Sequence, residues 1–401
     1  MTPNRIKVFH SYPRWELSGV ATWSTNLISA LDKSRFDQRI LLTSVRNLAQ
    51  KDILPPRELP TVLLHPEREK SYACGWYTLT AFLTAQAPCI YLPLFDFHSA
   101  CAVGLLPSNV AVCAGIRSDE EIYYENAERL GIYFDATVAA SQFLADECAR
   151  RVPTLADRIY YIPNGIAVTA DATPRFRTPN SPLRLLYANR LVQYQKRVFD
   201  LPKIASALRA MEVPFHLTIA GEGEDGMQLQ ERFAASDLTE YVTFLGRVSR
   251  SEVLKLCRSS DVFLLTSDFE GMPNSLLEAM STGCVPVAYR IRSGLEEIVT
   301  DLENGLLVSP GDCKAFAEAL RELYFNLVLF NALSVAALNR IRSRFSLRQM
   351  GDGYGQLFMQ LAEKVGRGDC SKRDGKVRKS PQIRLANRLI FRVRRMFSHP
   401  T

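Results

Sequence analysis

Residues 262–288 read VFLLTSDFEGMPNSLLEAMSTGCVPVA, and this stretch decides the fold. The run Val262–Leu265 is short and entirely apolar, as in a strand that is buried on both faces. A loop over 266–273 follows, then a helical stretch from Ser275 to Met280 and a second apolar run, Val285–Ala288. Strand, helix and strand in this order predict a doubly wound α/β unit with a parallel sheet.

The same alternation extends along the chain in two blocks. The first predicts strands at Ile6–Phe9, Arg39–Leu42, Cys89–Leu94, Val110–Ala114 and Ala136–Ala139, with a helix over Val20–Leu31. The second predicts strands at Leu183–Ala188, His216–Ala220 and Val242–Leu245, and helices over Phe199–Met211, Cys313–Phe325 and Phe345–Leu361. Residues 171–182, DATPRFRTPNSP, have the composition of a linker. We therefore predict an N-terminal domain over 1–172, a C-terminal domain over 181–345, a C-terminal helix over 346–365 and a tail over 366–401.

The net charge is concentrated at one end of the chain. The sequence carries 49 Lys and Arg against 42 Asp and Glu, a formal net charge of +7. Residues 366–401 alone carry eleven basic and two acidic residues, or +9, which leaves −2 for residues 1–365. A nearly neutral body lacks the basic stripe of a nucleic-acid-binding domain, so we expect no nucleic-acid partner.

The nine cysteines form no CxxC pair, and most lie within apolar runs. We expect them to be small buried side chains in a reducing compartment, without a metal site. The N-terminal residues lack the apolar core of a signal peptide, and the most apolar long stretch, Leu323–Leu338, is interrupted by polar residues. These features predict a cytoplasmic protein.

Two carboxylates eight residues apart follow the strand Val262–Leu265. Glu270 lies in the loop, and Glu278 lies about one turn into the helix, which we expect to open near Asn274 or Ser275. Asn and Ser are good N-caps, and free amides at a helix start bind phosphate. Ionised carboxylates only accept hydrogen bonds, which suits a ligand rich in hydroxyl groups. The alternative for Glu278 is a first-turn acid that the helix dipole favours.

This segment resembles the retaining glycosyltransferases of the GT-B fold, family 4, whose E-x7-E motif matches Glu270 and Glu278. The stretches 276–288 and 304–308 match the rest of the family pattern, and the resemblance covers about residues 6–361. It implies two Rossmann-like doubly wound domains that face a central cleft. It also implies a nucleotide-diphosphate sugar on the second domain, an acceptor on the first, and neither a cofactor nor a metal.

The resemblance assigns the donor-side residues. Arg190 and Lys196 match the two cations that clamp the diphosphate, with Asn189 in place of the usual glycine. Two cations after a strand end suit a pyrophosphate, since arginine offers a bidentate fork. Glu270 would position the sugar, and Glu278 would hold the ribose hydroxyls. The other donor-binding candidates are Gly19, Gly221, Gly223, Arg247, Gly271, Met272, Pro273, Asn274 and Ser275.

The N-terminal domain matches the family less closely. Gly19 lies in the counterpart of a glycine-rich loop, with Ser18 where the first glycine is usual. Family members often carry a histidine near the reacting carbon where this chain has Arg117. Either His98, after the strand Cys89–Leu94, takes that place, or Arg117 contacts phosphate or acceptor. We predict Glu270, Arg190, Lys196 and His98 as the catalytic group, and Arg117 and Asp119 as acceptor-side residues; the alternative for His98 is a structural role.

Residues 383–397, IRLANRLIFRVRRMF, place most apolar side chains on one side of a helix and five arginines on the other. A basic amphipathic helix is typical of binding to an anionic membrane surface, which suits a lipid-linked acceptor. The inner face of a membrane is therefore the predicted place of work. The alternatives are a helix docked on the body and a disordered tail.

The prediction is a metal-independent hexosyltransferase that moves a sugar, with retention, from a nucleotide-diphosphate sugar to a saccharide or lipid-linked acceptor. We expect it to act in cell-surface polysaccharide or glycolipid synthesis. Two alternatives stay open. One is a non-catalytic protein that binds nucleotide-sugars, suggested by Ser18 and Arg117. The other is a sugar-nucleotide epimerase or hydrolase on the same fold.

Overall fold

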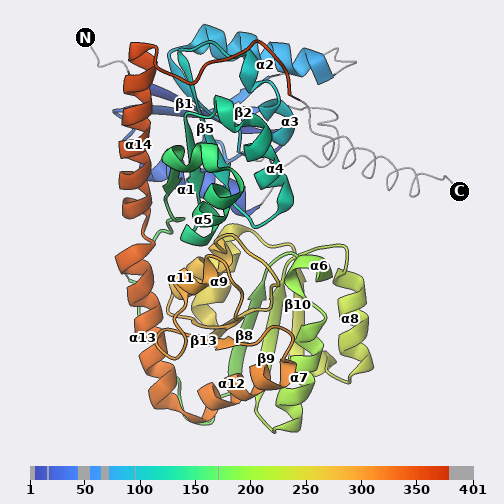
Figure 1. Cartoon of the computed structure of the whole chain (residues 1–401). Coiled ribbons are helices and arrows are strands. Elements are labelled where there is room, and N and C mark those ends of the chain that lie inside the picture. The colour runs from blue at the N-terminus through green and yellow to red at the C-terminus, as the bar shows by residue number, and fades with distance from the viewer. Residues whose placement is uncertain are drawn as a thin grey trace, which may run out of the picture. The chain divides into compact units, whose positions relative to one another are not determined.

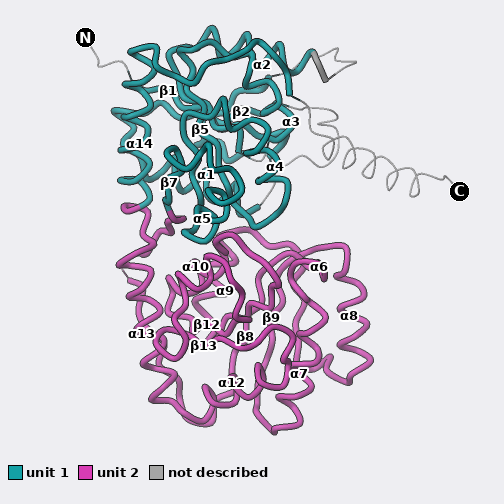
Figure 2. Tube along the Cα trace, in the orientation of Figure 1, with its two compact units in different colours: residues 1–162, 350–401 teal, residues 163–349 magenta. Residues whose placement is uncertain are grey.

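The computed structural model describes residues 5–15, 18–43, 55–64, 72–94, 96–169 and 171–378. The chain divides into two compact units: residues 1–162 with 350–401 form unit 1, and residues 163–349 form unit 2 (Figure 2). Each unit has its own sheet. The predicted amphipathic helix over 383–397 lies outside the described residues.

Unit 1 contains a seven-stranded parallel sheet in the order β3-β2-β1-β4-β5-β6-β7. Figure 1 shows the chain coloured from its N-terminus to its C-terminus. The strands of unit 1 are β1 (Ile6–Tyr12), β2 (Phe36–Leu42), β3 (Thr61–Leu63), β4 (Cys89–Leu92), β5 (Val110–Ile116), β6 (Ala136–Ala139) and β7 (Ile159–Tyr161). Its helices are α1 (Gly19–Ala30), α2 (Tyr72–Gln86), α3 (Phe97–Ala100), α4 (Glu121–Leu130), α5 (Gln142–Arg151) and the greater part of α14 (Leu347–Arg367). Short 3₁₀ turns lie at Val103–Leu105, Gly131–Tyr133 and Pro153–Arg158.

Unit 2 contains a six-stranded parallel sheet in the order β10-β9-β8-β11-β12-β13. Its strands are β8 (Leu183–Ala188), β9 (Phe215–Ala220), β10 (Val242–Gly246), β11 (Val262–Leu265), β12 (Val285–Tyr289) and β13 (Leu306–Val308). Its helices are α6 (Gln193–Lys196), α7 (Asp200–Ala210), α8 (Gly226–Ala235), α9 (Arg250–Ser259), α10 (Asn274–Met280), α11 (Leu295–Ile298), α12 (Cys313–Phe325) and α13 (Leu327–Arg344), with a 3₁₀ turn at Thr239–Tyr241. The predicted doubly wound α/β class is confirmed in both units.

The order of the strands locates the crevice of each sheet. In unit 2 the order reverses between β8 and β11, which are hydrogen-bonded neighbours with Val262 opposite Leu185. In unit 1 it reverses between β1 and β4. Ligands of open α/β sheets bind beyond the carboxyl ends of the strands at such switch points. We therefore expect ligands to bind at the loops that follow β8 and β11 in unit 2, and at those that follow β1 and β4 in unit 1.

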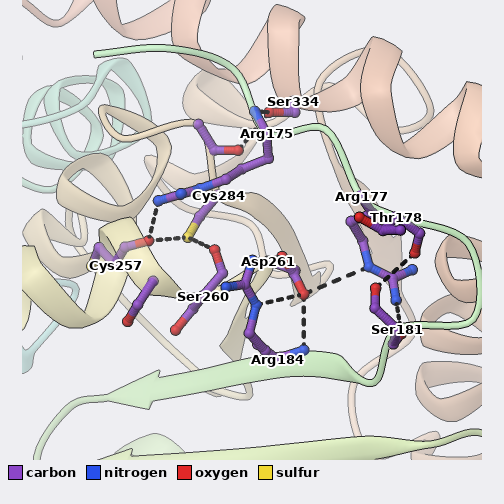
Figure 3. A network of polar contacts seen from close by, with 12 residues as sticks. Arg175, Arg177, Thr178, Ser181, Arg184, Cys257, Ser260, Asp261, Cys284 and Ser334 are labelled. Carbon is purple, nitrogen blue, oxygen red and sulfur yellow. Dashed lines mark hydrogen bonds and ion pairs between the residues drawn. The ribbon is translucent and has the colours of Figure 1, made fainter. Parts of the chain in front are cut away.

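The proline-rich stretch 171–182 packs on unit 2, and the division between the units falls earlier, between Ile162 and Pro163. Buried Arg177 lies 3.6 Å from the carboxylate of Asp261, which also accepts a 2.6 Å hydrogen bond from Arg184 (Figure 3). Arg175 donates to the carbonyl oxygen of Cys257 at 2.9 Å (Figure 3). Composition alone favours a linker here because arginines and prolines are common in loops, but these arginines find buried partners.

The first part of the basic tail packs on unit 1. Asp135, which is buried, accepts hydrogen bonds from the main-chain N–H of Ser371 at 2.5 Å and from Arg373 at 3.0 Å. Arg378 donates to the hydroxyl of Tyr133 at 2.7 Å. The segment over 370–378, called the strap below, is therefore part of the folded body. The predicted tail over 366–401 thus begins with a packed segment, and residues 379–401 carry six of its eleven basic residues and neither of its acidic ones.

Seven of the nine cysteines are buried, as predicted, while Cys74 is exposed and Cys313 is half-buried; all nine are unpaired thiols. Within the described ranges, no single helix has the length and apolar composition needed to cross a membrane. Helices α12 and α13 meet these criteria only as a pair, which is bent by 101°.

Candidate functional site

The loops after β8 and β11 bring a lysine and a glutamate together below the protein surface. Lys196 ends α6, and its ammonium contacts Oε1 of Glu270 in the loop after β11. The two side chains are only 9% and 8% exposed. The same oxygen of Glu270 accepts a 2.6 Å hydrogen bond from the hydroxyl of Ser267. Two of the four predicted catalytic residues, Lys196 and Glu270, therefore lie at the switch point of unit 2 in direct contact.

Hydrogen bonds to main-chain carbonyl oxygens hold these two loops against each other. The hydroxyl of Thr266 donates to the carbonyl oxygen of Lys196 at 2.7 Å, and the N–H of Asp268 donates to that of Gln195 at 2.9 Å. The side-chain amide of Gln195 donates to the carbonyl oxygen of Phe269 at 3.3 Å. Arg197, in a left-handed conformation at φ 46°, pairs with Asp268 at 3.2 Å. Lys196 and Glu270 are thus held in a defined geometry by the fold itself.

Helix α10 begins at Asn274, as predicted, but its N-cap differs from the prediction. The N-cap is Pro273, without a side-chain hydrogen bond, and neither Asn274 nor Ser275 caps the helix. The hydroxyl of Ser275 donates instead to Oδ1 of Asn189 at 2.9 Å, and Oδ1 of Asn274 accepts from Asn164 at 2.9 Å. Asn189, which replaces the usual glycine, therefore ties the end of β8 to α10. The two side chains are engaged elsewhere, so they cannot fold back onto their own helix.

The predicted turn Gly221–Gly223 packs on the loop after β8. A Cβ atom on Gly221, whose φ is +151°, would lie 1.9 Å from the carbonyl oxygen of Asn189. A Cβ atom on Gly223 would lie 2.1 Å from that of Leu191. The N–H of Leu191 donates to the carbonyl oxygen of Glu222 at 2.9 Å. These glycines thus allow the loop that carries Arg190 and Lys196 to approach the turn closely.

Glu278 is buried on α10, with a partner that the sequence analysis missed. Its Oε1 accepts a 2.7 Å hydrogen bond from Nε of Arg250, the first residue of α9. Burial raises the pKa of Glu278, and the charge of Arg250 opposes this rise. The signal for this pair was the position of Arg250, because a cation at a helix N-terminus is disfavoured by the dipole.

The remaining donor-side candidates are spread around this core. Arg190 is exposed and donates to Oε1 of Gln195 at 2.7 Å. Arg247, after β10, is exposed. The carbonyl oxygen of Gly271 accepts from the N–H of Gly294 at 3.0 Å, and that of Met272 accepts from the side chain of Asn164 at 3.2 Å. The loop 271–274 is therefore fixed from two sides within unit 2.

Unit 1 has its own polar cluster at its switch point. Asp96, after β4, is buried and accepts hydrogen bonds from the hydroxyls of Ser11 at 2.6 Å and Thr43 at 2.5 Å. Gly19 begins α1, whose N-cap Ser18 accepts from the N–H of Ala21 at 3.3 Å. Ser18 therefore replaces the usual first glycine with a capping side chain.

His98, predicted as catalytic, and the predicted acceptor-side residues Arg117 and Asp119 all have protein partners in unit 1. His98 stacks on Trp76, with ring centroids 5.2 Å apart, and its carbonyl oxygen accepts from the indole N–H at 2.9 Å. The guanidinium of Arg117 lies 3.8 Å from the ring centroid of Trp23 and donates to the hydroxyl of Tyr354 on α14. Asp119 accepts from the hydroxyl of Tyr124 at 2.7 Å. His98 thus packs on α2, and Arg117 connects α1 with α14.

In the part of the chain that the structure describes, no three His, Cys, Asp or Glu side chains are grouped as metal ligands would be. The buried groups of the site are instead two carboxylates, each paired with one cation. Such a site offers hydrogen-bond acceptors to hydroxyl groups and N–H donors to an anion. Together with the strand order, it defines a doubly wound α/β protein with a polar site at the switch point of unit 2.

Comparisons with known proteins agree with this class. Residues 171–327 match the family model "Glycosyl transferases group 1". Glycogen synthase of Mycobacterium tuberculosis is 29% identical over 233 residues, which cover 58% of this chain and 55% of that protein. The amylovoran biosynthesis glycosyltransferase AmsK of Erwinia amylovora is 32% identical over 150 residues, or 36% of each chain. The match thus spans about half of the first relative's length and about a third of the second's.

A solved structure of Anabaena HepE, in complex with UDP and glucose, superposes with a TM-score of 0.70 at 15% identity; the match covers 89% of this chain and 100% of that one. At this identity the likeness shows the fold. Over residues 171–327 the chain is similar to glycosyl transferases group 1, and the chain has the GT-B fold. The predicted family and fold are confirmed.

Proposed function

We propose that this protein is a retaining glycosyltransferase that moves a sugar from a nucleotide-diphosphate sugar to a saccharide or lipid-linked acceptor. The observation that carries the proposal is the buried pair of Lys196 and Glu270 at the switch point of a group 1 domain. The relative AmsK is an amylovoran biosynthesis glycosyltransferase, which favours cell-surface polysaccharide synthesis as the setting.

The chemistry assigned to the pair follows from hydrogen-bond capacity. An ammonium group has three N–H donors, and Glu270 accepts from one of them. The other two can donate to the diphosphate of the donor, together with the guanidinium of Arg190. These charges stabilise the negative charge that develops on the leaving nucleoside diphosphate. Glu270 then orients the ammonium and positions the sugar, and the reaction needs no metal or cofactor for this step.

A transfer assay tests the proposal. Each of a panel of UDP-, GDP- and ADP-sugars is incubated with the protein and with saccharide or lipid extracts, and both the released diphosphate and the anomer of the product are measured. We expect transfer with retention, and loss of it in Glu278→Gln and Lys196→Ala. Lys314→Ala, which removes an exposed lysine of α12, is the matched control and should keep full activity.

The two alternatives give different results in the same assay. A non-catalytic protein binds a nucleotide-sugar without turnover on any acceptor. An epimerase or hydrolase consumes the donor without an acceptor. Full activity of Lys196→Ala would contradict the assigned chemistry.

We also propose that the protein acts at a membrane surface, because the chain beyond the strap is positively charged. Residues 379–401 carry six basic residues and no acidic one. Attraction of such a segment to anionic lipid contributes about 1 kcal/mol per basic residue near the surface. Co-sedimentation with vesicles of anionic lipid should lose its signal when residues 379–401 are removed. Equal binding of the shortened chain would reject a membrane role for this segment.

A further inference from the structure

The pair of Arg250 and Glu278 links two helices next to the proposed nucleotide site. Arg250 is the first residue of α9, where the helix dipole disfavours a cation. Its guanidinium nevertheless donates from Nε to Oε1 of Glu278 at 2.7 Å. The arginine side chain is 33% exposed, whereas the glutamate side chain is 7% exposed. The arginine, one third of whose side chain is exposed, thus contacts a carboxylate that is almost fully buried.

Within its buried surroundings, the charged form of Glu278 is stabilised mainly by Arg250. Burial favours the neutral form of a carboxylic acid, and the pKa of Glu278 is raised by this effect. Arg250 opposes the rise both by its charge and by its hydrogen bond. A further titratable group that faces Glu278 is the buried thiol of Cys257, also on α9, which carries no positive charge. Among the described residues, Oε2 of Glu278 accepts no hydrogen bond and keeps its acceptor capacity.

We propose that Arg250 is a positioning residue for nucleotide binding: it fixes one oxygen of Glu278, so that the other accepts hydrogen bonds from the ribose hydroxyls of the donor. This inference rests on the proposed function, because it takes Glu278 as the ribose-binding carboxylate. Arg250 acts through Glu278 and does not itself contact the reacting atoms. A purely structural tie between α9 and α10 would have no such link to the ligand.

Calorimetric titration of the full chain between pH 5 and 8 tests the proposal. UDP, GDP and ADP are first titrated into the wild-type protein, and the diphosphate that binds is then used throughout. Arg250→Ala should weaken its binding about tenfold at pH 7, because a charged hydrogen bond to Glu278 is lost. The loss should grow as the pH falls, because Glu278 without its cation takes up a proton at a higher pH. The phosphate proton titrates near pH 6 in every variant, so the ratio of affinities to wild type is the readout.

Matched variants separate positioning from folding. Arg250→Lys keeps the positive charge and should recover most of the affinity, while Arg258→Ala, an exposed arginine on the same helix, should bind as wild type does. In a Glu278→Gln background, Arg250→Ala should have no further effect. If Arg250→Ala weakens binding equally at every pH, or binds as Arg258→Ala does, the positioning role is overturned while the proposed function stands. If wild type binds none of the three diphosphates, the proposed function fails first.

Discussion

At the scale of single residues, the site depends on charges that are buried in pairs. Lys196 and Glu270 are both buried, as are Glu278 and the carboxylate of Asp135. Removing one partner of such a pair leaves an uncompensated charge away from water, which costs about 3 to 5 kcal/mol. The sequence predicted that Lys196, Glu270 and Glu278 would share a site, because the family motif carries them. A cation at a helix start marks Arg250 as unusual, but the sequence could not predict its partner, which lies 28 residues away on another helix.

The pair of Lys196 and Glu270 predicts a stability effect separate from its effect on transfer. Lys196→Met should lower the free energy of unfolding by about 3 kcal/mol, since Glu270 stays buried without its cation. Adding Glu270→Gln should restore a large part of this loss, because the buried charge is removed. Urea denaturation of the two single variants and the double variant measures the coupling. Additive losses would contradict a direct interaction.

His10 predicts a pH dependence of stability. This residue of β1 is fully buried between Ser24 and Gln38, and burial lowers its pKa from 6.5 to about 4. The unfolded chain therefore binds a proton between pH 6.5 and 4 that the folded chain does not. As the pH falls from 6.5 to 4, the free energy of unfolding should therefore decrease by up to about 3 kcal/mol from His10 alone.

The prediction for His10 is tested by how steeply the urea midpoint changes with pH, not by its value at one pH. His10→Gln has no group that titrates in this range, so its urea midpoint should decline less steeply than that of wild type between pH 7 and 4.5. Parallel declines in the two proteins would show that His10 takes up its proton equally in both states.

At the scale of elements, strands with strong apolar runs were predicted well. β6, β8 and β11 have the predicted bounds, because each is a largely apolar and mostly buried run, interrupted only by Thr137 in β6 and Arg184 in β8. The edge strands β3, β7 and β13 were not predicted; each has three residues, too few to show a pattern. The N-cap of α10 was wrong, because the partners of Asn274 and Ser275 come from distant segments.

The turn after β9 predicts a glycine requirement that acts through the neighbouring loop. Gly223→Ala would place Cβ against the carbonyl oxygen of Leu191 and displace the segment that carries Arg190 and Lys196. We expect at least a tenfold loss of nucleoside diphosphate affinity and a loss of stability of about 2 kcal/mol. Gly366→Ala, at an open position near the end of α14, is the control and should change neither quantity measurably. Calorimetric affinity of Gly223→Ala equal to that of wild type would contradict the packing role of the turn.

At the scale of the whole molecule, the boundaries of the two units and the packing of the tail differ from the prediction. Residues 171–182 were predicted as a linker and residues 366–401 as a basic tail. Long-range contacts instead hold residues 171–182 and the strap in place, since Asp261 and Asp135 bind arginines from these two segments. The predicted roles of His98 in catalysis and of Arg117 and Asp119 on the acceptor side stay predictions. His98, Arg117 and Asp119 each contact an aromatic side chain of unit 1, and no sequence pattern signals such packing.

The strap predicts where the chain can be shortened. A chain that ends at residue 378 keeps Ser371 and Arg373 on Asp135, and its free energy of unfolding should match that of the full chain. A chain that ends at residue 369 loses both partners and should be less stable by about 3 kcal/mol. Urea denaturation compares them, with Arg373→Ala as a point variant expected to resemble the shorter chain. Equal stability of all four proteins would show that the strap does not contribute to the fold.

The central claim is that unit 2 binds a nucleotide-diphosphate sugar between the loops that follow β8 and β11. Hydrogen–deuterium exchange with UDP-, GDP- and ADP-sugars tests it most directly, because it locates binding without knowledge of the acceptor. One donor should slow exchange in peptides that cover residues 189–197 and 266–278, and Lys196→Ala should abolish this protection. Binding of a donor with protection confined to other segments, or no protection by any donor, would contradict the account.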